Sequence, residues 1–353
     1  MLVEKTSSGH RLYYVGILAA TALTSGDSVL LVLHSDEVEA PAVLTHLGPI
    51  RSKISIASTN DFSLDSIGNL SRKYGADLTL IPDGDSFALE IAKKCSWSGA
   101  GALTLLIMRE RASRSLLPGL QRTKSFLKMV LLKRAEAVAG VRIVRLLSAI
   151  DSNSKVKSSI AAVADPVTMT ADVGDSTRLR TKWGMNSEKY WFSVLGAITR
   201  RKNVSVVARA LLRLRTPGVG LLIAGVCDPI VMSEVRPILS SLREAGVGVI
   251  VVNRLLTELE LDAAVGASDC IVLAHSNEGP SGLFGKALAT GTRIVAAGAI
   301  SLRHDANRVP GLAHWSRLND RSVASSMYSA HRLNRPIAQK LPDSVDFASM
   351  LLQ

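Results

Sequence analysis

The stretch SNEGPSGLFGKALATGTRIVAAG, residues 276–298, decides how this chain is interpreted. An acid, Glu278, and several glycines stand directly before an apolar segment with helical spacing, which leads into a β-branched run. Glycine lets backbone N–H groups approach a ligand, and a helix N-terminus carries a partial positive charge. The loop therefore predicts a phosphate or diphosphate site, formed by the N–H groups of Ser281, Gly282 and Leu283.

Short apolar, β-branched runs alternate with helical segments over almost the whole chain, a pattern typical of parallel sheets with crossover helices. The first series has predicted strands at 28–33, 53–58, 77–82, 102–108 and 141–147, and helices at about 11–25, 63–74, 86–94 and 122–138. The second series has predicted strands at 191–197, 220–225, 247–253, 270–275 and 293–298, and helices near 203–214, 231–245, 257–266 and 283–290. We therefore predict an α/β protein with two Rossmann-like domains.

A polar, irregular segment with a turn signal at Asp165-Pro166 separates the two series. We expect an N-terminal domain over 1–167 and a C-terminal domain over 168–325. Residues 326–353 are expected to form a helix and a tail that cross back to the N-terminal domain. The carboxyl ends of the two parallel sheets would then face a central cleft, where ligands normally bind.

Composition narrows the classes of partner. The 353 residues carry a net charge of +12, which indicates an anionic partner without choosing among nucleotide, nucleic acid and anionic lipid. Aromatic residues make up 4% of the chain and do not interleave with its basic run as in a base-stacking platform, so nucleic acid is not expected. The three cysteines lack metal-ligand spacing, and no apolar run reaches the length of a membrane span. We expect no metal site and a cytoplasmic protein, either soluble or peripheral on the inner face of the membrane.

The basic run lies between residues 109 and 145, where ten Lys or Arg accompany two acids. Within it the predicted helix brings Phe126, Met129, Val130 and Lys133 near one another. One interpretation is an ordinary solvated helix face. The other is a surface for anionic headgroups or a lipid-linked acceptor, with Lys124, Lys128 and Lys133 directed at it.

The motifs between residues 255 and 298 resemble the donor-binding region of the retaining glycosyltransferases of family four, which have the GT-B fold. The family pattern is A-S-D-x-x-x-x-P-S, then E-G-F-G, four further residues and a second E, and then A-x-A-x-G-x-P-V-V. The residues in register are Ala267, Ser268, Asp269, Ser276, Glu278, Gly279, Ala287, Ala289, Gly291 and Val295. The resemblance identifies Glu278 as the residue that holds the sugar of the donor, in an orienting role.

Two further segments are similar to the same family. SVLGAITRRKNVSVVARAL resembles the family's V-G-R-L-x-x-x-K-G element, with Gly196 and Lys202 in the matching positions. SSGHR, residues 7–11, takes the place of the glycine loop after the first strand, so Gly9 and His10 are candidates for a donor or acceptor contact.

The chain departs from the family pattern at three places. The second acid of the E-to-E motif is Lys286, which donates only and cannot accept from ribose hydroxyls, although its charge would suit a diphosphate. The arginine of G-R-L is Ala197, so Arg200 or Arg201, close to Lys202, is expected to supply the missing charge, and we take Arg201 as the candidate. At the end of the N-domain strand where many relatives carry a histidine, this chain has Met108-Arg109.

The resemblance implies transfer of a sugar from a nucleoside diphosphate-sugar to a glycan, lipid-linked or small-molecule acceptor, with retention and without metal or cofactor. Polysaccharide biosynthesis is the expected setting. Two alternatives stay open: a noncatalytic partner of another transferase, and, less favoured, a protein that binds an anionic polymer.

Overall fold

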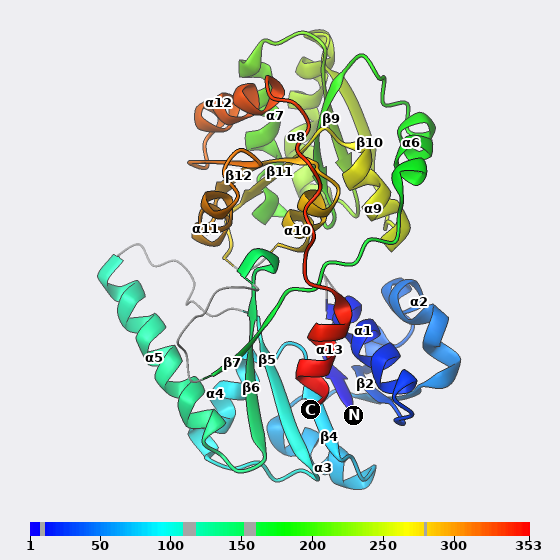
Figure 1. The fold of residues 1–353 in the computed structure, drawn as a ribbon, viewed down its shortest axis with the longest axis vertical. Helices are drawn as coiled ribbons and strands as arrows, with labels where there is room; N and C mark the ends of the chain where they lie inside the picture. Colours follow the sequence, from blue (N-terminus) through cyan, green and yellow to red (C-terminus); the bar gives the residue numbers. More distant parts are fainter. Residues whose placement is uncertain (8–10, 109–117, 152–159, 279–280) are drawn as a thin grey trace. The chain divides into compact units, whose positions relative to one another are not determined.

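The computed structural model describes residues 1–353 apart from 8–10, 109–117, 152–159 and 279–280. The chain divides into two units, one formed by Met1–Pro166 together with Pro342–Gln353 and the other by Val167–Leu341 (Figure 1). Each unit contains one sheet in which every pairing is parallel. The prediction of an α/β protein with two Rossmann-like domains is therefore confirmed.

The first unit has seven described strands in the order β3-β2-β1-β4-β5-β6-β7. The strands are β1 (Leu2–Glu4), β2 (Leu30–His34), β3 (Ser55–Thr59), β4 (Leu78–Ile81), β5 (Ala102–Ile107), β6 (Val141–Leu147) and β7 (Ala161–Ala164). The helices are α1 (Arg11–Thr24), α2 (Pro41–Leu47), α3 (Leu64–Lys73), α4 (Asp85–Lys94), α5 (Pro118–Glu136) and α13 (Ser344–Leu352). Sequence patterns missed β1, β7 and α2, since each has seven residues or fewer and shows little periodicity.

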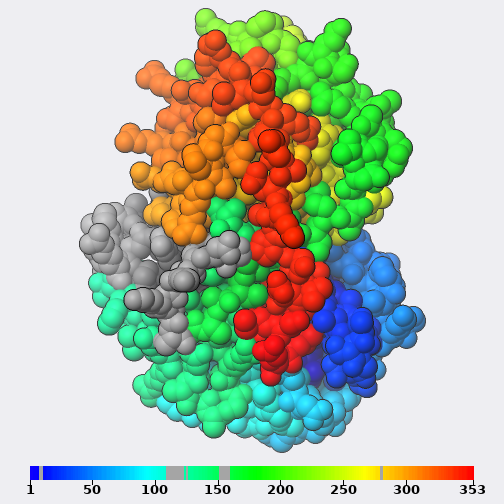
Figure 2. All heavy atoms as spheres, in the orientation of Figure 1, coloured from blue at the N-terminus to red at the C-terminus, as the bar shows by residue number. Residues whose placement is uncertain are grey.

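The last helix of the chain belongs to the core of the first unit. In α13, Phe347, Ala348 and Leu351 are buried in one apolar cluster with Tyr14 of α1. The rings of Phe347 and Tyr14 lie 5.3 Å apart. Figure 2 shows α13 in red beside α1 in blue on the surface of this unit. The segment 326–353 therefore belongs to both units. Its first residues form the end of α12 in the second unit, and the residues from Pro342 onward belong to the first unit.

The second unit has six described strands in the order β10-β9-β8-β11-β12-β13. They are β8 (Tyr190–Leu195), β9 (Val219–Ala224), β10 (Gly248–Val252), β11 (Cys270–His275), β12 (Arg293–Gly298) and β13 (Ala313–Ser316). The helices are α6 (Val173–Lys182), α7 (Val204–Leu214), α8 (Pro229–Glu244), α9 (Glu258–Ala267), α10 (Gly282–Ala289), α11 (Ile300–Arg308) and α12 (Asp320–His331). The sequence analysis took 173–182 as irregular, but Asp172 and Asp175 form a capping box that starts α6 there.

Both sheets reverse their strand order at one point. In the first unit the reversal falls between β1 and β4, and in the second between β8 and β11. In open parallel sheets, ligands bind beyond the carboxyl ends of the strands at such a point. None of the described helices combines the length and the apolarity that crossing a membrane requires.

Candidate functional site

The structure joins the two motifs of the second unit at the carboxyl ends of β8 and β11. The short turn η4 (Arg200–Lys202) follows β8. The carbonyl of Arg201 accepts from the N–H of Ser276 at 3.0 Å and from the side-chain amide of Asn203 at 2.9 Å, and the same amide donates to the carbonyl of Ala274. These bonds hold the lysine motif against the loop that follows β11.

Gly196 and Gly225 bring two strand ends into close contact. Gly225 has a φ of +134°, and a Cβ placed on it would lie 2.1 Å from the carbonyl oxygen of Gly196. Gly196 has a φ of +83°, and a Cβ there would stand 3.6 Å from Nζ of Lys202. Glycine at 225 therefore permits the close contact of the two strand ends, and glycine at 196 keeps side-chain atoms away from the ammonium group.

Lys202 is the buried cation of this site. Its side chain reaches back along the end of β8, where Nζ donates to the carbonyl of Leu195, and the residue is 5% exposed. Burial, assisted by the charge of the exposed Arg201, lowers the pKa of Lys202 from its usual value to about 7. An anion placed beside Nζ would compensate that cost and favour the charged form.

Three buried polar atoms surround the same strand ends and lack a hydrogen-bond partner among the described residues. They are Oγ1 of Thr199, Nε2 of His275 and Oδ1 of Asn277. Burial first, and then the charges of Lys202 and Arg201, lower the pKa of His275 to about 3, so its ring is neutral. Buried polar atoms are normally paired, which makes these three candidates for ligand contacts.

Sequence reasoning missed Thr199, His275 and Asn277. The sequence signal was their position directly after, or at the end of, strands β8 and β11. That position alone does not separate them from neighbours whose polar atoms are satisfied.

Glu278 caps a helix in this structure. Its Oε1 accepts from the N–H of Ile300 at 3.0 Å, and its Oε2 accepts from the N–H of Ser301 at 2.9 Å. These are the first amides of α11, whose N-cap residue, Ala299, has no polar side chain. The carboxylate thus satisfies two free donors at a positive helix end, which fixes its orientation.

The start of α10 presents backbone amides, as predicted. Ser281 is its N-cap but makes no capping bond through its side chain within the described part of the chain. The first turn, beginning with Gly282 and Leu283, contains no acidic residue. A helix end of this kind favours an anion.

Lys286 lies inside the second unit and is 4% exposed. Its Nζ forms an ion pair with Asp262, contacts Glu258 at 3.6 Å and donates to the carbonyl of Thr168 at 3.0 Å. Two carboxylates thus compensate its charge. The expectation that Lys286 adds positive charge for a diphosphate gains no support from these contacts, and the residue instead ties α10 to α9.

The structure does not test every predicted site residue. Gly9, His10 and Gly279 lie outside the described residues. In the described ranges, no three His, Cys, Asp or Glu side chains gather as a metal site.

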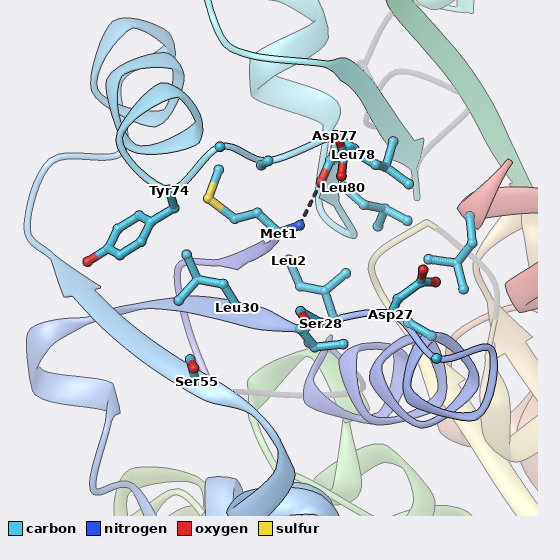
Figure 3. Close-up of a pocket in the computed structure, with 16 residues that line it drawn as sticks. Met1, Leu2, Asp27, Ser28, Leu30, Ser55, Tyr74, Asp77, Leu78 and Leu80 are labelled. Carbon is cyan, nitrogen blue, oxygen red and sulfur yellow. Dashed lines mark hydrogen bonds between the residues drawn. The ribbon is translucent and has the colours of Figure 1, made fainter.

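A cavity of about 620 Å³ lies at the amino ends of β1, β2 and β4 in the first unit (Figure 3). There the amino group of Met1 donates to the carbonyl of Leu78 at 2.6 Å. It is at the opposite end of the sheet from the strand ends where parallel sheets bind ligands. We assign it no role.

Comparison with known proteins bears on the fold. No protein-family model and no curated protein matches the chain in sequence. Among solved structures, Anabaena Alr3699/HepE in complex with UDP and glucose is similar with a TM-score of 0.66 at 13% identity, covering 99% of this chain and 94% of that one. A glycosyltransferase from Rickettsia africae ESF-5 has a TM-score of 0.64 at 14% identity, with 94% and 87% covered. WaaG, a glycosyltransferase of lipopolysaccharide biosynthesis, has a TM-score of 0.58 at 12% identity, with 94% and 90% covered.

These neighbours agree with the two reversed parallel sheets and with the resemblance drawn from the motifs of residues 190–298. The chain has the fold of the GT-B glycosyltransferases.

Proposed function

We propose that the protein transfers a sugar from a nucleoside diphosphate-sugar to an acceptor, with retention at the anomeric carbon and without a metal or cofactor. The observation that carries the proposal is the buried ammonium of Lys202 at the sheet's reversal point, beside three buried polar atoms without partners among the described residues. A protein rarely keeps such a cluster without a ligand to satisfy it.

The donor's diphosphate fits this cluster by charge. Lys202, Arg201 and the N-terminal amides of α10 at Ser281, Gly282 and Leu283 are the groups that would stabilise negative charge on the departing diphosphate. The solved complexes of HepE contain UDP and UDP-glucose, which supports a uridine nucleotide as the first donor to test.

Glu278 has an orienting role in this proposal. Its two bonds to the start of α11 hold the carboxylate in one place, and a carboxylate fixed in this way can orient a sugar through the sugar's hydroxyl groups. Fixing the sugar in this way positions the anomeric carbon for attack.

Thermal shift against UDP, GDP, ADP and their sugar conjugates is the first test, because a ligand of the native state raises the apparent stability. We expect a shift with one nucleotide that is lost in Lys202→Ala and in His275→Ala. The matched control Lys340→Ala, an exposed lysine of the same unit, should keep it. No shift with any of these nucleotides would contradict the donor site and favour a noncatalytic partner of another transferase.

A second proposal concerns α5, which we suggest faces an anionic membrane that carries a lipid-linked acceptor. Phe126, Leu127 and Val130 are 72%, 56% and 44% exposed on this helix, which also carries the exposed Lys124. Apolar and basic residues together favour an anionic lipid surface. Of the three lysines expected to face the headgroups, Lys128 instead forms an ion pair, because its Nζ lies 2.6 Å from the carboxylate of Asp85 in α4.

Flotation with phosphatidylglycerol vesicles tests this surface. We expect binding that falls at least fivefold in the double variant Phe126→Ser, Leu127→Ser and is absent with neutral phosphatidylcholine vesicles. The matched double variant Leu44→Ser, Tyr74→Ser changes exposed apolar residues elsewhere and should bind normally. Equal binding to both kinds of vesicle would refute the proposal.

A further inference from the structure

The first unit has its own cavity at its point of strand reversal. Residues at and just after the ends of β1 and β4 line a cavity of about 180 Å³, among them Glu4, Asp83 and Ser86, together with Arg11 of α1. This is smaller than the roughly 300 to 1,000 Å³ of pockets that enclose a whole drug-sized ligand. Its size therefore suits one ring or side group of a larger molecule.

Glu4 gives the cavity an unsatisfied polar atom. The residue is 2% exposed, and its Oε1 accepts from the N–H of Thr6 at 3.1 Å. Its Oε2 is buried and has no hydrogen-bond partner in the residues that the structure describes. A buried oxygen without a partner destabilises the protein, so a ligand that donates a hydrogen bond to it is favoured.

Arg11 and Asp83 set the polarity of the cavity wall near Glu4. Nη2 of Arg11 bonds the carboxylate of Asp83 at 2.5 Å, whereas Nη1 stands 4.0 Å from Oε1 of Glu4, too far for a hydrogen bond. The guanidinium therefore keeps N–H donors for a ligand. The wall offers donors from Arg11 and acceptors from Glu4 and Asp83 within one small space.

The charges in the cavity disfavour an ionic ligand. Two carboxyl groups and the two cations Arg11 and Lys5 line it, so neither sign of charge predominates. Burial raises the pKa of Glu4 to about 7, which reduces the charge further near neutral pH. Hydroxyl groups both donate and accept, and thus match acceptors and donors at once. The rings of Phe62 and Phe87, which also line the cavity, suit the C–H face of a sugar.

We propose that this cavity binds the hydroxyl groups of a neutral sugar or related polyol, held by Glu4, Arg11 and Ser86. The bound group is the acceptor, or its terminal sugar, and that part of the inference rests on the transfer reaction proposed above. The carboxyl of Glu4 binds and positions a hydroxyl, and no covalent step is assigned to it.

Saturation-transfer NMR on the full chain tests the site, with methyl glucoside as the neutral probe and glucose 6-phosphate and glucosamine as charged analogues. We expect the neutral probe to bind and its affinity to fall at least tenfold in Glu4→Leu. That variant removes the unsatisfied Oε2 together with Oε1, the acceptor of the Thr6 N–H, so urea unfolding should confirm that it is folded under the conditions of the binding measurement. Ser86→Ala, at an exposed position, should weaken binding without affecting the fold. The control Glu39→Gln, an exposed acid of the same unit, should bind normally.

The thermal shift with the nucleotide, measured on the same variants, separates the two proposals. A retained nucleotide shift with lost methyl glucoside binding and lost transfer in Glu4→Leu supports the acceptor site. Absence of a nucleotide shift in the unaltered protein refutes the transfer reaction and with it the acceptor role, while the sugar result still decides the binding site. Undiminished methyl glucoside binding in Glu4→Leu, no binding by the unaltered protein, or stronger binding of either charged analogue would overturn the proposal.

Discussion

At the scale of single residues, the candidate donor site depends on polar groups that the fold has buried. Lys202 is the main example, because its burial, with no carboxylate partner among the described residues, holds its pKa near 7 instead of 10.5. A diphosphate beside Nζ reverses this effect by favouring the charged form. The binding of a nucleotide-sugar and the protonation of Lys202 should therefore be coupled.

This coupling gives nucleotide binding a pH dependence with a definite sign. Below about pH 7 the free protein already carries the charged lysine, and affinity is at its highest. As pH rises above 7, the charged fraction in the free protein falls, so affinity for UDP-glucose should weaken by up to tenfold per pH unit. Titration calorimetry at pH 8 in buffers of different ionisation enthalpy should register proton uptake. Lys202→Met should bind UDP-glucose weakly at every pH without taking up a proton, whereas the control Lys340→Met should behave as the unaltered protein. Absence of proton uptake when the unaltered protein binds UDP-glucose would contradict the coupling.

Glu278 combines a structural and a proposed functional role, and the two can be separated. Glu278→Ala should lower the free energy of unfolding by about 1 to 2 kcal/mol, since it removes an anion from the start of α11. Adding Ala299→Ser places a capping hydroxyl at the same helix end and should recover much of that loss, as measured by urea unfolding. Sugar transfer should stay abolished in the double variant. Restored transfer would show that Glu278 acts only by holding α11.

At the scale of elements, close packing of strand ends shapes the site. Gly225 meets the backbone of Gly196 so closely that a methyl group has no room, and its φ of +134° is also strained for other residues. Gly225→Ala should therefore destabilise the protein by about 3 kcal/mol or more and weaken nucleotide binding. Gly246 also has a positive φ, of +78°, but open space around it, so Gly246→Ala should cost only about 1 kcal/mol with normal binding. Equal costs for the two variants in urea unfolding would argue against the close contact.

At the scale of the whole molecule, the chain returns to its first unit through α13. Phe347 and Leu351 are 1% and 0% exposed in the core of that unit, and burial of such side chains contributes roughly 1.5 to 3 kcal/mol each. Removal of residues 342–353 should therefore destabilise the first unit by about 3 to 6 kcal/mol, seen as faster hydrogen exchange in α1, while the second unit keeps its nucleotide shift. Phe347→Ala should show a smaller effect of the same kind, and Val345→Ala, 62% exposed on the same helix, almost none. Unchanged exchange in α1 would refute this.

The sequence by itself determined both series of strands and helices and the loop between Ser276 and Gly298, because hydrophobic periodicity, glycine and capping residues act over a few neighbouring positions. It also identified the anion-favouring start of α10 and the lysine motif. It did not reveal the short β1, β7 and β13, whose three or four residues become strands only through pairing with longer neighbours.

Only the tertiary structure decided what each polar group contacts. Glu278 accepts hydrogen bonds from the start of α11, and Lys286 forms an ion pair with Asp262. Lys202 and His275 are buried, and so desolvated, at the ends of adjoining strands. The buried Oε2 of Glu4, which has no hydrogen-bond partner in the described part of the chain, likewise follows from the way β1, β4 and α1 come together. These partners are separated by many residues along the chain, and ion pairing and desolvation depend on distance in space, which no local pattern of the sequence records.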